Sequence, residues 1–165
     1  MTQATDVHIA PATPDDVPLI LGLIRELAVY EKLEDQVSAT EAVLRESLFG
    51  PASGAQALVA SVGGEPAAFA LYFHNFSTFL GRRGLYLEDL FVRPAFRGRG
   101  VGKALLVHLA GVALARGCGR FDWQVLDWNR SARDFYESLG AVPVAGWVNY
   151  RVTGDALRRL ALGEA

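Results

Sequence analysis

The sequence feature that most limits the possible folds of this chain is a glycine-rich stretch between a strand-like pattern and a helical pattern. Glycine occupies three of the five positions from Gly98 to Gly102. A strand-like alternation over Leu85–Val92 precedes this stretch, and apolar residues with helical spacing follow from Val101. A backbone without side chains can approach a ligand closely, and the first N–H groups of a helix have no partner within the helix. The sequence therefore predicts a strand–turn–helix unit that can bind phosphate.

Positive charge is concentrated at this turn in Arg93, Arg97, Arg99 and Lys103, although the whole chain has a net charge of −2. This combination is typical of a pyrophosphate site. A Walker loop is excluded because it needs glycine at position 97 and serine or threonine at position 104, which is Ala104. The spacing also differs from the G-x-G-x-x-G pattern of dinucleotide-binding folds. Taken alone, the segment also fits a glycine turn whose arginines are simply solvated.

The rest of the chain alternates between strand and helix patterns, which predicts one α/β (α+β) domain over residues 1–165. A first helix is expected from a cap at Thr13 to about Tyr30, and Ser38 with Glu41 forms a capping box for a second helix. The expected strands are Val7–Ala10, Leu58–Val62, Ala67–Asn75, Leu85–Val92, Phe121–Leu126, Val142–Val144 and Trp147–Val152, and the remaining helices are one from Val101 that stops at Gly117, Ser131–Leu139 and Asp155–Leu162.

Composition excludes several classes of function. The single cysteine, Cys118, allows no internal disulfide, and the three histidines are far apart in the sequence, so we expect no metal site. A net acidic chain argues against general binding of nucleic acid. The most apolar segment, Ala104–Ala115, is too short to cross a membrane, and Met1–Asp6 lacks the pattern of a signal peptide. We therefore expect a cytoplasmic protein that binds neither nucleic acid nor membrane.

The pattern R-x-x-G-x-G that begins at Arg97 resembles the acetyl-CoA loop of the GCN5-related N-acetyltransferase (GNAT) superfamily, and the order of predicted elements matches this family over nearly the whole chain. The resemblance implies a central, mixed, mostly antiparallel twisted sheet with helices on both faces. It also implies acetyl-CoA as co-substrate, with no metal. The implied acetyl-CoA site contains Leu90, Phe91, Val92, Arg97, Gly98, Arg99, Gly100, Val101, Gly102, Lys103, Asn129 and Ala132.

Three further segments, Leu27–Glu31, Tyr86–Val92 and Trp128–Tyr136, resemble the diamine (spermidine/spermine) N1-acetyltransferase branch, which includes thialysine acetyltransferases. This resemblance implies acetyl transfer to the primary amine of a small cationic metabolite, such as a diamine, a polyamine or a lysine analogue. It also implies a homodimer, to which the last two expected strands could contribute. The alternatives are a lysine or N-terminal amine of a protein as acceptor, or a CoA-binding module without catalysis.

Acetyl transfer to an alkylammonium needs a group that removes a proton, because the ammonium has a pKa near 10.4. Glu88 and Asp89 lie on the expected cofactor strand, and the resemblance assigns the role of base to Glu88. It assigns to Tyr136 the donation of a proton to the CoA sulfur. From the residues alone, the two acids could also be solvated strand-end residues, and Tyr136 could be a structural tyrosine.

The resemblance also implies an amine pocket. It is lined by Tyr30, Glu31, Glu88, Asp89 and Trp147, a combination of acidic and aromatic groups that suits a cation.

One position departs from the polyamine-acetylating branch, which carries an acid two residues before this tryptophan. The present chain has Ala145 there, which removes an anchor for a distant second ammonium. A shorter amine or an amino-acid-like substrate is therefore as good a candidate as a long polyamine.

Overall fold

The computed structural model describes residues 6–164. The segment Met1–Asp6, which lacks the pattern of a signal peptide, therefore lies outside the described residues except for Asp6. The chain forms two compact units that divide between Leu126 and Asp127, and each is described by itself. A single domain over the whole chain stays a prediction. Within residues 6–164, every helix is too short or too polar to span a membrane.

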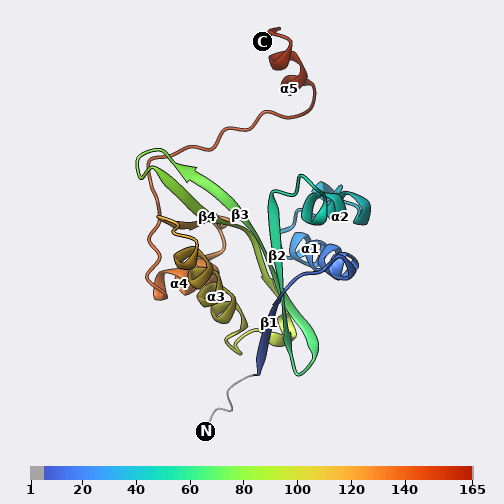
Figure 1. Ribbon diagram of the computed structural model, residues 1–165, viewed down its shortest axis with the longest axis vertical. Helices are drawn as coiled ribbons and strands as arrows, with labels where there is room; N and C mark the ends of the chain where they lie inside the picture. Colours follow the sequence, from blue (N-terminus) through green and yellow to red (C-terminus); the bar gives the residue numbers. More distant parts are fainter. Residues whose placement is uncertain (1–5, 165) are drawn as a thin grey trace. The chain divides into compact units, whose positions relative to one another are not determined.

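The first unit is built on one mixed sheet of five strands in the spatial order β1-β2-β3-β4-β5 (Figure 1). The first four strands pair antiparallel, whereas β4 and β5 pair in parallel, which confirms the expected mixed, mostly antiparallel sheet. The strands are β1 (Val7–Pro11), β2 (Ala55–Val62), β3 (Glu65–Ser77), β4 (Arg82–Val92) and β5 (Phe121–Trp123).

Helices cover both faces of this sheet, as predicted. Helices α1 (Val17–Glu31) and α2 (Glu41–Phe49) lie on one face, and α3 (Val101–Ala115) lies on the other (Figure 1). The core under α1 and α2 includes Phe69 of β3 and Phe91 of β4, both buried. The second unit contains α4 (Arg130–Ser138) and α5 (Gly154–Ala161).

Two details of the predicted elements were wrong at the level of single residues. Helix α2 is capped by Thr40, whose hydroxyl accepts a hydrogen bond from the backbone N–H of Val43 at 3.3 Å, and not by Ser38. The strand expected at Phe121–Leu126 ends at Trp123, because its parallel pairing with β4 ends there.

The expected strands Val142–Val144 and Trp147–Val152 are absent from the second unit. Their alternating apolar residues predicted strands, but a strand also needs a neighbour that completes its hydrogen-bond ladder. The segment has no such neighbour among the described residues, and its apolar side chains are exposed, including Trp147 at 80% and Tyr150 at 94%.

Candidate active site

Strand β4 carries an irregularity at Glu88, the predicted base, and Asp89, which is predicted to line the amine pocket. Asp89 pairs with Leu71 of β3, but the next pair in the register joins Leu87 to Tyr72. Glu88 is therefore an extra residue with no opposite partner, which is the arrangement of a β-bulge. Its side chain is exposed, whereas that of Asp89 is half-buried. Bulges re-aim side chains, and this one gives the two neighbouring carboxylates different surroundings.

The second half of β4 has an open edge. Strand β5 pairs only with Leu85–Leu87, so the edge of β4 after the bulge has no strand beside it among the described residues. The N–H of Arg93 donates to the carbonyl of Ala67 in β3, and backbone groups alternate in direction along an antiparallel pair. Leu90 and Val92 therefore direct their backbone groups to the open edge, whereas those of Phe91 face β3.

The glycine turn has the geometry that the sequence predicts. Gly98 and Gly100 have φ angles of 73° and 81°, a left-handed region in which glycine carries no steric penalty. Helix α3 starts directly after Gly100, and its first intrahelical bond runs from the N–H of Ala104 to the carbonyl of Gly100. The N–H groups of residues 101–103 thus have no acceptor within the helix and can bind an anion.

The cations around the turn have distinct partners. Arg97 donates from Nε to the carbonyl of Val92 at 2.9 Å, and its guanidinium carbon lies 4.6 Å from the centre of the Tyr30 ring. Arg99 lies 5.6 Å from the centre of the Phe96 ring. Arg93, which the sequence grouped with these cations, instead pairs with Glu26 of α1.

Two neighbouring carboxylates of the first unit affect the ionisation of Asp89. The pKa of Asp89 is raised from its ordinary 3.8 to about 6, first by burial and then by the negative charges of Glu88 and Glu31. Burial also raises the pKa of Glu31, at the end of α1. No group of His, Cys, Asp or Glu side chains in residues 6–164 is arranged to hold a metal ion. The arrangement is an acidic site suited to a cation that can lose a proton.

The remaining predicted site residues belong to the second unit. Asn129 caps α4, because its Oδ1 accepts a hydrogen bond from the N–H of Ala132 at 3.2 Å. The ring of Tyr136 is half-buried, with its centre 5.5 Å from that of Phe135. Trp147 is exposed in the extended segment before α5. The roles of these four predicted site residues in binding or catalysis stay predictions.

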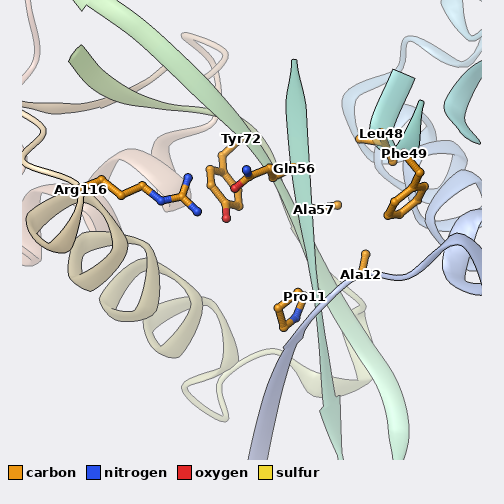
Figure 2. A pocket seen from close by; sticks show the side chains of 8 residues that line it. All are labelled: Pro11, Ala12, Leu48, Phe49, Gln56, Ala57, Tyr72 and Arg116. Carbon is orange, nitrogen blue, oxygen red and sulfur yellow. The ribbon is translucent and has the colours of Figure 1, made fainter. Parts of the chain in front are cut away.

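A pocket of about 290 Å³ lies elsewhere in the first unit (Figure 2). Arg116 and Tyr72 lie on one side of β2 in this view, and Leu48 and Phe49 lie on the other. None of the predicted site residues lines this pocket. The predicted site residues of the first unit lie instead at the end of α1, at the bulge and open edge of β4, and at the turn.

Comparison with known proteins identifies the family. The acetyltransferase (GNAT) family matches residues 23–141. Thialysine N-epsilon-acetyltransferase of Bos taurus is 43% identical over 166 residues, which cover 94% of this chain and 97% of the bovine protein. L-ornithine N5-acetyltransferase of Arabidopsis thaliana is 32% identical and covers 93% of this chain and 87% of its own length. The solved structure of an integron cassette protein of V. cholerae superimposes with a TM-score of 0.79 at 31% identity, covering 94% and 97% of the two chains.

The chain belongs to the acetyltransferase (GNAT) family. Within this family it is an N-acetyltransferase, similar over nearly its whole length to an enzyme that is named for thialysine. The family resemblance drawn from the glycine turn is thereby confirmed.

Sequence reasoning missed the contacts between α1 and the segment before the turn. Glu26 and Tyr30 are four residues apart on α1, and their partners Arg93 and Arg97 are also four residues apart. Residues four apart share one face of a helix, so Glu26 and Tyr30 can both contact this segment. Nothing in the sequence, however, indicated that these two segments meet.

Proposed function

We propose that this chain transfers the acetyl group of acetyl-CoA to the terminal primary amine of a small cationic metabolite, such as a lysine analogue like thialysine, a diamine or a polyamine. The observation that carries this proposal is that the negative charges of Glu88 and Glu31, together with burial, raise the pKa of Asp89 to about 6. Asp89 and Glu88 lie where β4 continues beyond its parallel partner β5. A group of carboxylates attracts an ammonium ion, and a carboxylate can accept its proton.

The turn and the open edge of β4 fit acetyl-CoA as the co-substrate. The N–H groups of residues 101–103 and the cations Arg97, Arg99 and Lys103 suit its pyrophosphate. The backbone groups of Leu90 and the N–H of Val92 suit the amides of its pantetheine arm, whereas the carbonyl of Val92 already accepts from Arg97. Acetyl-CoA supplies an activated thioester carbonyl.

In the proposed reaction, Glu88 accepts one proton from the ammonium, directly or through water, and ionised Asp89 and Glu31 attract the cation. The neutral amine then forms the C–N bond to the acetyl carbon while the C–S bond breaks, and the nitrogen releases its second proton to solvent as it becomes an amide. Tyr136 donates its phenolic proton to the departing sulfur and later regains a proton from solvent. The carboxyl group of Glu88 releases its proton to solvent, so the reaction produces an amide and CoA thiol without net change at the protein.

Amino acids with a side-chain amine are the substrate class that we favour within this proposal. The two relatives described above are named for thialysine and L-ornithine, both of which have such an amine. Ala145 lacks the carboxylate that would hold a distant second ammonium of a long polyamine. Tyr30 already interacts with one cation, the guanidinium of Arg97, so its ring is suited to this type of contact.

We also propose a homodimer in the cytoplasm, with no nucleic-acid or membrane partner. The extended segment of the second unit exposes Val142, Val144, Trp147, Val148 and Tyr150, each at 74% or more. Exposed apolar residues in a contiguous segment are typical of a surface that binds another chain. Light scattering on the purified protein should give twice the monomer mass, and a monomer at micromolar concentration would contradict the homodimer.

A thiol-release assay with acetyl-CoA and a panel of acceptors tests the proposal. We expect the highest kcat/KM with thialysine, ornithine or a short diamine, and lower values with spermine and with peptides. Glu88→Gln should lose activity most at low pH, because its amide cannot accept the proton. Turnover only with peptides would contradict the proposed substrate class, and CoA binding without turnover of any amine would indicate a module without catalysis.

A further inference from the structure

Helix α1 contacts both ends of the short segment that leads from β4 into the glycine turn. A 3-10 turn, η3 (Pro94–Phe96), forms the middle of this segment. Glu26 pairs with Arg93 just before η3, and Tyr30 contacts Arg97 just after it. The helix therefore holds the segment at two points, one helical turn apart on its own surface.

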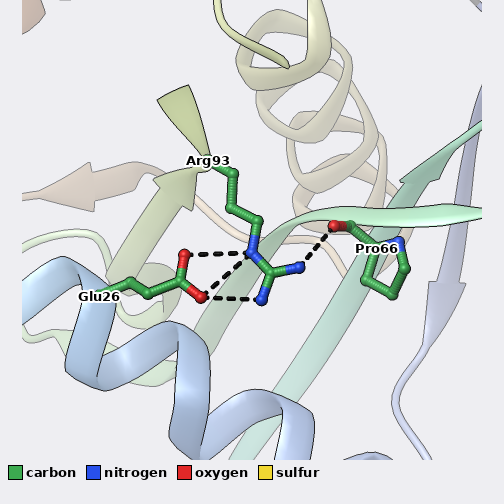
Figure 3. A network of polar contacts seen from close by, with 3 residues as sticks. All are labelled: Glu26, Pro66 and Arg93. Carbon is green, nitrogen blue, oxygen red and sulfur yellow. Dashed lines mark hydrogen bonds and ion pairs between the residues drawn. The ribbon is translucent and has the colours of Figure 1, made fainter. Parts of the chain in front are cut away.

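The contact at Arg93 uses every nitrogen of its guanidinium (Figure 3). Nε lies 3.2 and 3.1 Å from the two carboxylate oxygens of Glu26, and Nη2 donates to Glu26 Oε1 at 2.8 Å. Nη1 donates to the carbonyl of Pro66 in β3 at 2.9 Å. The backbone N–H of Arg93 also donates to the carbonyl of Ala67. Arg93 thus joins α1, β3 and the end of β4 at the start of η3.

These contacts matter for the turn because its glycines have wide conformational freedom. Gly98 and Gly100 can adopt many backbone conformations when unbound, and ordering them on binding costs free energy. An anchor at Arg93 and a second at Arg97 restrict the chain that enters the turn, while α3 restricts the chain that leaves it. A site held in its binding conformation loses less entropy on binding and has higher affinity.

We propose that Glu26 and Arg93 are positioning residues that set the affinity for acetyl-CoA by holding the phosphate-binding turn against α1. This inference rests on the proposed use of acetyl-CoA. The nitrogens of Arg93 are already engaged by Glu26 and Pro66, so it acts through the turn and not by contact with phosphate. Because α1 ends at Tyr30 and Glu31, the same helix supports the cofactor turn and the wall of the proposed amine pocket.

The test is the affinity for CoA, measured by isothermal titration calorimetry on the full chain, together with steady-state kinetics. Arg93→Met and Glu26→Gln should each raise the Kd of CoA and the KM of acetyl-CoA about tenfold, equivalent to about 1.4 kcal/mol. The kcat at saturating acetyl-CoA and the KM of the amine should change less than about twofold, because the chemical step is not altered.

A matched control is Arg25→Met, which removes an arginine from the same helix. Arg25 is exposed and makes no hydrogen bond or ion pair with another described residue, so this variant should bind CoA like the parent. The double variant Glu26→Gln/Arg93→Met should bind CoA no more weakly than the single variant with the lower affinity, because both substitutions break the same contact between Glu26 and Arg93. If Arg93→Met folds poorly, Arg93→Lys replaces it in the test. This variant keeps the charge, so its Kd for CoA should lie between the parent value and the roughly tenfold higher value expected for Arg93→Met.

Two results would overturn the inference. Unchanged CoA affinity in folded Arg93→Met and Glu26→Gln would remove the positioning role, as would a loss of thermal stability with kcat reduced and both KM values unchanged. If the parent itself does not bind CoA, the proposed function fails, and this inference fails with it. Parent binding with unaffected variants contradicts the inference alone.

Discussion

Glu88 and Asp89 are neighbours in the sequence, but the bulge in β4 gives them different environments. Glu88 is exposed, and Asp89 is half-buried with its pKa raised to about 6. The carboxyl group of Asp89 therefore ionises near neutral pH, at a position where burial and two other carboxylates oppose its charge. Residues whose pKa values are shifted in this way are frequent at functional sites.

A raised pKa makes Asp89 a source of pH-dependent stability. The folded state favours the neutral carboxyl group, so its contribution to stability is complete below the ordinary pKa of 3.8 and is lost as the pH rises through about 6. Asp89→Asn, which is neutral at every pH, should raise the free energy of unfolding by about 3 kcal/mol at pH 8 and leave it nearly unchanged at pH 3.5. Urea unfolding at the two pH values measures this difference, and equal stability of variant and parent at pH 8 would contradict it.

Tyr136 gives a second prediction for a single residue. If its phenol donates a proton to the sulfur, Tyr136→Phe should lower kcat about 100-fold with little change in the KM of acetyl-CoA, because the lost interaction belongs to the transition state. Tyr150→Phe is the matched control, since Tyr150 is 94% exposed in the same unit. Steady-state kinetics with an accepted amine measure the kcat of both variants. An unchanged kcat in Tyr136→Phe would remove this residue from the mechanism.

The conformation of a single residue could be predicted where the few residues around it determine that conformation. Gly98 and Gly100 of the turn have the positive φ angles that only glycine adopts easily, and Asn129 caps α4 with a side chain of the type that favours this position. The bulge at Glu88 and the ion pair of Glu26 with Arg93 could not be predicted in this way. Both depend on how strands and helices distant in the sequence are brought together, and no short-range pattern records this.

At the scale of elements, the hairpin of β3 and β4 shows how closely two strands can approach at a glycine. Gly84 of β4 is buried opposite Asn75 of β3, and a Cβ atom at Gly84 would overlap with Asn75 Oδ1. That oxygen is buried without a hydrogen-bond partner among the described residues. The pair leaves no room for a side chain at position 84.

Gly84→Ala should therefore lower the free energy of unfolding by about 1–3 kcal/mol. Thermal or urea unfolding measures the loss, and adding Asn75→Ala should recover part of it by removing the obstructing oxygen. Gly111→Ala, at an exposed position of α3, is the control: no atom beyond the helix's own backbone lies within 4 Å of its new Cβ, so the better helix former should stabilise by about 0.5–1 kcal/mol. Equal effects of the two substitutions would contradict the steric account.

The elements themselves were predictable where helix caps and hairpin turns mark their ends. Gly63 and Gly64, both with positive φ angles, lie in the turn between β2 and β3, two strands that the sequence predicts separately, and α1 begins and ends within a few residues of its predicted limits. The strands expected at Val142–Val144 and Trp147–Val152 were wrong because alternation records which side chains are apolar and not whether a partner strand is present.

At the scale of the whole molecule, the family and the first unit's sheet follow from the order of elements and the turn, and the comparisons confirm the family. The predicted site residues fall in both units. Those at the carboxylates, the open edge and the turn belong to the first unit, and the second unit contains Asn129, Ala132, Tyr136 and Trp147. The proposed reaction uses groups from both sets, so the kinetics of Glu88→Gln and Tyr136→Phe test it.

The most direct measurement is the site of acetylation on thialysine after incubation with acetyl-CoA and the full-length protein, located by tandem mass spectrometry. We expect one acetyl group on the side-chain nitrogen, a free α-amino group, and one equivalent of CoA thiol for each product. Absence of the product, or an acetyl group on the α-amino nitrogen alone, would contradict the proposed transfer to the terminal amine.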